Sequence, residues 1–250
     1  MTIKLSTSFN NPALPLATPL GQQILGFSSL YSWAQADAAT TAISSGTSIA
    51  SFVDRRPGAV GWAQPAAGRQ AALTPAQIGG YAAAVFDGVD DHYSHPDPDF
   101  DFTQPFTIIA LLNGSAAGGA DMQVMSRFND LANRTYVNIR PSSVDFLHGS
   151  GMATLPYARG TWGLVIAASN QTQLKMRING VSAAPAATNN AAGTNQWSLG
   201  SLYDGTIQQP FRGAIADVLV FSEDIIANAA RLSLVEKYFV NTYGLSFTPA

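Results

Sequence analysis

The stretch AVFDGVDDHYS, from Ala84 to Ser94, decides the fold class of this chain. An apolar run ends at Asp87-Gly88, and a second strand-like run resumes after a pair of aspartates. Asp-Gly between apolar runs is a strong hairpin signal, because both residues tolerate the positive φ angles of tight two-residue turns. The stretch therefore predicts a strand, a tight turn and a second strand, and it indicates an all-β fold.

Apolar runs of strand length recur downstream, and Asx-Gly pairs punctuate them. The runs are FTIIALL (106–112), TWGLVIAA (161–168), QLKMRI (173–178) and GAIADVLVF (213–221). The pairs are Asn113-Gly114, Asn179-Gly180 and Asp204-Gly205. Short strands separated by turn residues are typical of a β-sandwich or a β-barrel.

The last segment has helical rather than strand periodicity. From Glu223 to Tyr243 the apolar positions fall at spacings of four, three, three and four: Ile225, Ala229, Leu232, Val235 and Phe239. Such spacing places them on one buried face of a helix. Ser222 can cap the start of this helix and Gly244 can end it. We therefore expect a helix over 223–243 on the rim of the sandwich.

The first 26 residues differ in composition from the rest of the chain. Pro12, Pro15 and Pro19 occur among small residues, which disfavours a helix and extends the chain. We interpret residues 1–26 as an extended arm, and a disordered leader is the alternative. Residues 27–250 are long enough for a single β-sandwich domain that includes the terminal helix.

Composition excludes several classes of partner. The chain has 250 residues, a net charge of −3 and only 12% charged residues, so it lacks the clustered cations that bind nucleic acid. It has no cysteine, and therefore no disulfide and no thiolate metal site. The N-terminus lacks the apolar core of a signal peptide, and no apolar stretch approaches the ~20 residues that span a bilayer. We expect a protein made in the host cytoplasm and carried on a virion or phage-like particle, or else secreted without a signal peptide.

In their order along the chain, these pieces resemble the concanavalin A-like lectin/glucanase superfamily, in its laminin-G-like jelly-roll branch. The pieces are FDGVDD, DFDFTQPFTI, Trp162, Asn179-Gly180, Ser198-Leu199-Gly200, FRGAIADVLVFS and Tyr243-Gly244-Leu245. The resemblance extends from about Tyr31 to Leu245. It implies an all-β, single β-sandwich jelly roll of two antiparallel sheets with a C-terminal rim helix, and carbohydrate as the class of ligand.

The superfamily includes glycosidases, so we ask whether this chain has the carboxylates that those enzymes need. Retaining glycosidases need two carboxylates about 5 to 5.5 Å apart, and the catalytic branch carries a Glu-x-Asp-x-Glu run. The only glutamates here are Glu223 and Glu236, both in the expected helix. Aspartates alternate in HPDPDFDF (95–102), but its two prolines argue against an interior strand. We therefore predict that the chain is not an enzyme.

Two sets of polar residues are candidates for binding. Asp87, Asp90 and Asp91 offer the hard oxygen ligands that calcium prefers, and the alternative, which we favour, is that they accept hydrogen bonds within the turn. No other cofactor is expected. Sugars stack on aromatic rings and bond to amides and charged groups, so a second set near predicted turns suits a glycan. That set is Trp62, Arg134, Asn195, Gln196, Trp197, Tyr203 and Asp204, of which Trp197 has a core position as its alternative.

The leading functional hypothesis is a non-catalytic recognition or display module of a phage or phage-like particle. It would bind a cell-surface polysaccharide and contact other particle proteins through the N-terminal arm. The alternatives are a purely structural decoration or fibre protein without a ligand, and a secreted glycan-processing enzyme, which would need a carboxylate pair.

Overall fold

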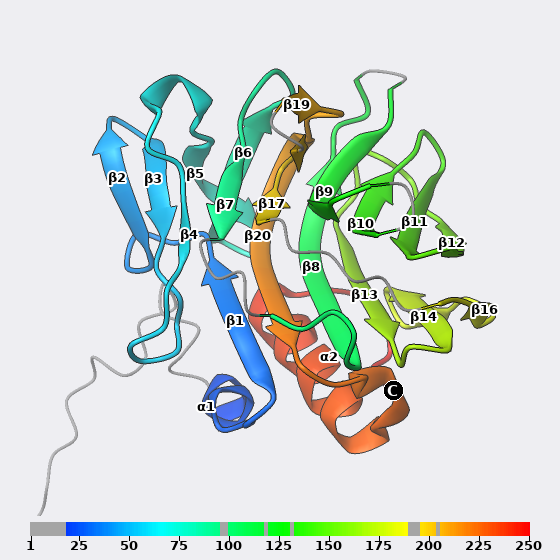
Figure 1. Cartoon of the computed structure of the whole chain (residues 1–250). Helices are drawn as coiled ribbons and strands as arrows, with labels where there is room; N and C mark the ends of the chain where they lie inside the picture. Colours follow the sequence, from blue (N-terminus) through cyan, green and yellow to red (C-terminus); the bar gives the residue numbers. More distant parts are fainter. Residues whose placement is uncertain (1–18, 96–99, 118–119, 131–132, 190–195, 204–205) are drawn as a thin grey trace, which may run out of the picture.

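The computed structural model describes residues 19–95, 100–117, 120–130, 133–189, 196–203 and 206–250 (Figure 1). Nearly all strands pair antiparallel and form two layers, which we term the first sheet and the second sheet. The first sheet contains β1 (Leu30–Gln35), β5 (Ala72–Ile78), β6 (Tyr81–Asp87), β8 (Phe106–Gly114), β13 (Gly163–Ser169), β14 (Gln173–Ile178), β15 (Val181–Ser182), β16 (Ala186–Ala187) and β20 (Arg212–Phe221).

The second sheet lies across the sandwich core from the first. It contains β2 (Thr41–Ser45), β3 (Ser48–Phe52), β4 (Trp62–Ala63), β7 (Tyr93–His95), β9 (Met122–Phe128), β10 (Arg134–Ile139), β11 (Ser143–His148), β12 (Gly151–Pro156) and β17 (Trp197–Leu199). A separate short hairpin, β18 (Leu202–Tyr203) with β19 (Ile207–Gln208), lies against β9. The predicted β-sandwich jelly roll of antiparallel sheets is confirmed.

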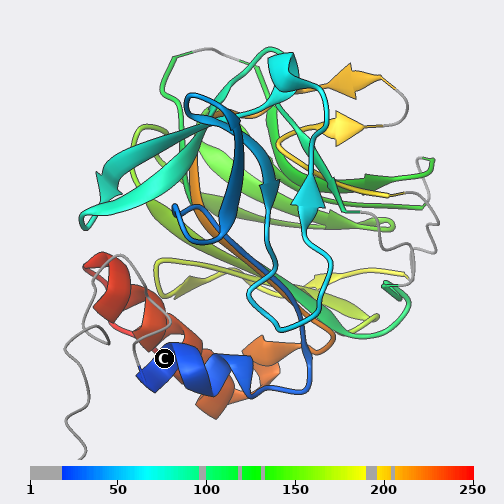
Figure 2. The same ribbon diagram turned by 90° about the vertical axis from the view of Figure 1, so that its left-hand side faces the viewer.

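The two α-helices, α1 (Pro19–Leu25) and α2 (Ala229–Tyr243), lie on one side of the sandwich, with a short 3₁₀ turn at Ile225–Ala227 next to α2. A second 3₁₀ turn, Ala67–Arg69 between β4 and β5, lies away from them (Figure 2). Figures 1 and 2 show α1 beside α2, with both helices next to the first sheet. Among the described residues, none of these helices has the length and apolar character to cross a bilayer.

Strand β8 shows how the layers are held together. Ile108 and Leu112 point into the core between the sheets, and Ile109 and Leu111 point toward α2. A strand buried on both faces has a continuous apolar run rather than an alternating pattern. The run FTIIALL thus forms the centre of the molecule.

The terminal helix ends where expected but begins later. Gly244 ends it at φ 68°, in the left-handed region that favours glycine. Asn228 caps its start by accepting from the backbone N–H of Arg231 at 3.2 Å. Asp224 caps a separate 3₁₀ turn before it, at 225–227. The expected helix over 223–243 is therefore two elements, because a second capping side chain interrupts it.

The predicted hairpin at Asp87-Gly88 is wrong, although the turn exists. Strand β6 pairs with β5 and β20, whereas β7 pairs with β4 and β17. The segment after Asp87 therefore carries the chain from the first sheet to the second. By contrast, Asn179-Gly180 does form a two-residue hairpin, with Ile178 opposite Val181.

The expected N-terminal arm, residues 1–26, is only partly described. Residues 1–18 lie outside the described residues, so an arm there remains a prediction. Residues 19–25 instead form α1, which buries Ile24 completely in the layer under α2. Pro19 starts the helix, a position at which proline's fixed φ and missing N–H are tolerated.

Candidate functional site

The outer face of the second sheet carries a group of polar side chains. On β10, Val137 and Ile139 point into the core. Because side chains alternate along a strand, Arg134, Tyr136 and Asn138 lie on the opposite, outer face. No helix of the described residues lies over this face (Figures 1 and 2).

Neighbouring strands extend the group. Asn138 lies opposite Gln123 of β9 and Asp145 of β11. Asp145 forms an ion pair with Arg140 and accepts from the Thr154 hydroxyl at 2.9 Å. We use the name polar face for a set that comes from three adjacent strands: Gln123, Arg134, Tyr136, Asn138 and Asp145.

Several buried atoms of the polar face lack a hydrogen-bond partner. Asn138 is 3% exposed and Gln123 is 2% exposed. Within the described residues, neither Oδ1 of Asn138, nor Oε1 of Gln123, nor Nε of Arg134 has a partner. Buried polar atoms are nearly always hydrogen-bonded in native proteins, either to protein or to ordered water, so these atoms are available to bond to solvent or to a ligand.

Charged groups surround Tyr136 at the centre of this face. Burial raises the pKa of its phenol, and the carboxylates of Asp145 and Asp121 act in the same direction, against Arg134 and Arg140. The guanidinium of Arg134 also lies 5.7 Å from the centre of the Tyr136 ring. The phenol is therefore neutral at physiological pH and can donate a hydrogen bond.

A cavity of about 530 Å³ adjoins the polar face at the rim of the sandwich. Its lining residues are Gly88, Ala117, Ala120, Asp121, Met122, Arg159, Gln209, Pro210 and Arg212. Two hydrogen bonds connect it to the polar face: Asn138 Nδ2 donates to Asp121 at 3.4 Å, and Gln123 Nε2 donates to Gln209 at 2.7 Å. The cavity, here named the rim cavity, and the polar face form one continuous site.

Backbone features at the rim cavity are of the kind found at binding sites. Gln209 has a φ of 47°, which costs energy for a residue other than glycine and is maintained by its bonds to Gln123. Gly88, at φ 79°, lets the side chain of Arg212 pass, since a Cβ there would lie 2.6 Å from the Cβ of Arg212. Arg212 is exposed and forms no ion pair with any described residue.

Two of the residues predicted to bind a glycan are instead in the core. Trp62 and Trp197 are 0% and 1% exposed, and their rings pack 5.9 Å apart among other aromatic side chains. Their strands, β4 and β17, point these rings between the sheets. This corrects the prediction that they form a stacking surface, and Trp197 takes the core position that was its alternative.

The structure describes only some of the other residues that were predicted to bind a ligand. Arg134 belongs to the polar face, and Gln196 is exposed next to β17. Tyr203 is in β18, which lies against β9, but its side chain is not described. Asn195 and Asp204 lie outside the described residues. Sequence reasoning missed Tyr136, Asn138 and Gln123, whose signal was the alternation of polar and apolar residues in RTYVNI, 134–139.

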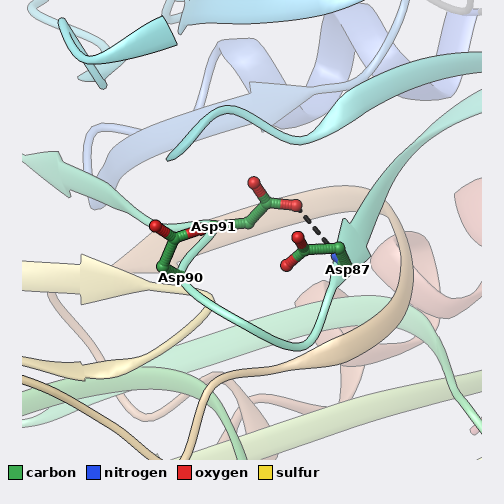
Figure 3. A group of neighbouring side chains, drawn as sticks. All are labelled: Asp87, Asp90 and Asp91. Carbon is green, nitrogen blue, oxygen red and sulfur yellow. Dashed lines mark hydrogen bonds between the residues drawn. The ribbon is translucent and has the colours of Figure 1, made fainter. Parts of the chain in front are cut away.

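The aspartates predicted as turn acceptors or calcium ligands do cluster (Figure 3). Ligand atoms of Asp87, Asp90 and Asp91 all lie within 4.8 Å of one another. Asp91 accepts from the backbone N–H of Asp87 at 2.8 Å, and Asp87 accepts from that of Val89 at 2.7 Å. Burial, with the charges of Asp87 and Asp90, raises the pKa of Asp91 to about 6, although the Asp87 N–H lowers it. The cluster acts in the turn, and its remaining oxygens could hold a hard cation such as calcium.

The glutamates of the terminal segment are engaged in structural contacts. Glu236 is fully buried, pairs with Arg177 at 3.0 Å and accepts from the backbone N–H of Ala250 at 2.6 Å. Glu223 forms an ion pair with Arg231 and accepts from the Ser29 hydroxyl at 2.7 Å. These contacts attach the C-terminal helix and tail to the first sheet and to the segment after α1.

Solved structures with a similar fold include carbohydrate-binding proteins. A Trypanosoma rangeli sialidase in complex with sialic acid matches with a TM-score of 0.57 at 10% identity, over 87% of this chain and 34% of the sialidase. A botulinum neurotoxin serotype D binding domain matches with a TM-score of 0.53 at 12% identity, over 85% and 50%. Botulinum neurotoxin type C, whose cell entry depends on two ganglioside molecules, matches with a TM-score of 0.55 at 12% identity, over 86% and 52%.

The chain thus spans about a third of the sialidase chain and about half of the neurotoxin chains. At these identities the likeness shows the fold alone. No curated protein sequence matches the chain.

The prediction that the chain is not an enzyme is overturned by these structures. Sialidases are enzymes, and chains with this fold occur in them. Sialidases use a tyrosine nucleophile, so a missing glutamate pair does not exclude glycoside chemistry.

A family model identifies the fold family directly. The model of the concanavalin A-like lectin/glucanases superfamily, in its laminin-G form, matches residues 87–227, more than half of the chain. The match begins in the Asp87 turn, covers the polar face and ends before α2. This chain belongs to the concanavalin A-like lectin/glucanases superfamily.

Proposed function

We propose that this protein is a carbohydrate-recognition domain whose polar face and rim cavity bind a polysaccharide. The observation that carries the proposal is a group of polar atoms around Tyr136 that have no partner among the described residues. They lie on a sheet face over which no described helix packs, next to a cavity of about 530 Å³. Ligand sites of that volume, with a few convergent polar groups, are typical of small-molecule and sugar binding.

The chemistry of the polar face suits sugar hydroxyls. Oδ1 of Asn138 and Oε1 of Gln123 accept hydrogen bonds, whereas the Arg134 guanidinium and the Tyr136 phenol donate them. The Tyr136 ring also offers an apolar surface for the C–H face of a sugar. A pyranose presents alternating donors, acceptors and C–H groups, so it can satisfy all of these at once.

We further propose that the domain is displayed on a phage or phage-like particle, where its ligand is a polysaccharide of the host surface. Residues 1–18, with Pro12 and Pro15, are proposed to attach it to other particle proteins. Deletion of residues 1–18, which keeps α1, should leave thermal stability and glycan binding unchanged and abolish incorporation into the particle. Normal incorporation of the truncated protein would contradict the attachment role.

Glycan binding can be tested with an array of host capsule and lipopolysaccharide oligosaccharides, followed by calorimetry on each hit. Tyr136→Ala and Asn138→Ala should each weaken binding at least tenfold, because about 1.4 kcal/mol of contact free energy is lost. Lys237→Ala, at an exposed position on α2, is the matched control and should bind like wild type. Retained affinity in both polar-face variants would contradict the proposal.

The same experiment separates recognition from catalysis. Release of reducing sugar from a bound glycan by wild type, but not by Tyr136→Phe, would place an enzymatic reaction at the polar face. Absence of any glycan hit, with normal particle assembly, would favour a structural decoration protein.

A further inference from the structure

A second cavity lies where α2 ends, in the layer between that helix and the first sheet. Its volume is about 460 Å³, within the range of ligand sites. Its lining residues are Gln77, Ile78, Gly79, Trp162, Asn179, Tyr243, Gly244, Leu245, Ser246 and Phe247. It shares none of them with the rim cavity, and none of them is charged. We refer to it as the helix-end cavity.

One wall of this cavity is Trp162, the tryptophan that differs most from the others. Trp33, Trp62 and Trp197 are each at most 1% exposed, whereas Trp162 is only partly buried. Its indole Nε1 donates to the backbone oxygen of Gln77 at 3.2 Å, which fixes the ring at the cavity wall. Trp162 therefore lies at the edge of the core rather than inside it.

A polar group faces the same space from the turn between β14 and β15. Oδ1 of Asn179 accepts from the backbone N–H of Leu164 at 2.8 Å, so the orientation of the amide is set. Its Nδ2 has no hydrogen-bond partner among the described residues. Asn179 and Ala76, which precedes Gln77, both have positive φ angles, 48° and 54°. Such conformations are costly for Ala and are enriched at functional sites.

We propose that the helix-end cavity is a second binding site and that it takes an uncharged saccharide. An ionic ligand would lose part of its hydration on entering the cavity, and an uncharged lining offers no ion pair in return. The lining therefore disfavours acidic sugars, phosphates and charged peptides. An indole wall with amide groups beside it matches a ligand that has both C–H faces and hydroxyls. An apolar side chain of a protein partner would leave the Nδ2 group of Asn179 without a hydrogen-bond acceptor.

Trp162 provides a direct readout. Because the other tryptophans are buried, acrylamide should quench Trp162 selectively. The probes are the hexasaccharides of maltose, cellulose and chitin, with a polygalacturonate oligosaccharide as the charged comparison. We expect at least one neutral probe to protect Trp162 saturably, with a dissociation constant of about 1 mM or tighter. The charged probe should not protect it.

Two variants locate the binding. Asn179→Asp keeps the turn and the acceptor for Leu164 but replaces the free amide donor with a charge, so it should weaken binding at least tenfold. Trp162→Phe should remove binding measured by calorimetry. Asn138→Ala, on the polar face, should leave binding at the helix-end cavity unchanged, which separates this proposal from the proposed function.

The proposal is overturned if no neutral probe protects Trp162 up to about 20 mM, or if protection is undiminished in Asn179→Asp. It is equally overturned if only a peptide with apolar side chains protects the ring. Should Trp162→Phe fail to fold, Asn179→Asp still decides the outcome, because it retains the hydrogen bond within the turn.

Discussion

The two sheets face each other across one core and differ on their outer faces. The outer face of the first sheet is covered by α2 and is apolar, with Ile109, Leu111 and Leu219 fully buried beneath the helix. The outer face of the second sheet is polar, and some of its buried atoms lack partners. Buried polar atoms without a partner among the described residues occur on both sides, Gln35 Oε1 beneath α2 being one of them. The two faces therefore differ in what covers them: α2 packs on the first sheet, and no described helix packs on the polar face of the second.

The largest expected effect concerns the covered face. Phe239 of α2 is fully buried and stacks on Tyr243 with ring centres 5.9 Å apart. Phe239→Ala should lower the free energy of unfolding by about 3 to 5 kcal/mol, measured with urea, because it leaves a cavity. Met152→Ala, 48% exposed on the outer side of β12, is the control and should cost less than about 0.5 kcal/mol. Equal effects would remove the contrast between the two faces.

A second prediction uses the carboxyl buried beneath α2. Asp217 accepts from Trp33 Nε1 at 2.8 Å, from Tyr243 at 3.0 Å and from Tyr238 at 3.3 Å. Burial raises its pKa to about 7, although Arg55 and these donors lower it. In the folded state the Asp217 carboxyl therefore stays protonated up to about pH 7, whereas in the unfolded state it loses its proton near pH 4. Because the folded state favours the protonated carboxyl, the free energy of unfolding should fall as pH rises from about 4 to about 7.

The isosteric variant isolates that contribution. The side chain at position 217 cannot titrate in Asp217→Asn. Between pH 4 and 7 the unfolding free energy of the wild type should therefore fall by on the order of 3 kcal/mol relative to that of the variant. Unfolding by urea at several pH values measures it. Asp91, whose pKa is about 6, shifts stability in the same direction in both proteins and cancels in the difference. Parallel pH profiles for wild type and Asp217→Asn would contradict this prediction.

On the uncovered face we expect a substitution that stabilises. Asn138→Leu removes a buried oxygen without a partner and replaces it with an apolar group of similar size. The free energy of unfolding should rise by about 1 kcal/mol, while glycan affinity falls. Thermal unfolding together with calorimetry checks both. A loss of stability comparable to that of Phe239→Ala would show that Asn138 serves the fold.

The smallest effect is expected at the aspartate cluster beside the rim cavity. If Asp87, Asp90 and Asp91 act as acceptors within the turn, thermal midpoints in calcium and in chelator should agree within about 1 °C. A midpoint several degrees higher in calcium, lost in Asp91→Asn, would instead assign a cation to the cluster.

Local sequence signals predicted the parts of the fold that depend on neighbouring residues. QLKMRI (173–178) coincides with β14, and Gly244 ends α2, because periodicity and φ preference act over a few residues. Asn179-Gly180 forms its hairpin for the same reason. Asp87-Gly88 does not, because β6 already pairs with the adjacent strand β5 (72–78) on one edge and with β20 (212–221), far away in sequence, on the other.

The sequence by itself thus determined the all-β class, the central apolar strands and the family. The tertiary structure decided which side chains face a ligand. Trp62 and Tyr136 are both aromatic residues in strands, yet Trp62 points between the sheets and Tyr136 points outward. The difference lies in which layer covers each face of a strand, and that depends on long-range pairing rather than on local residue type. The polar face and the helix-end cavity therefore emerge only when the sheets and α2 are assembled.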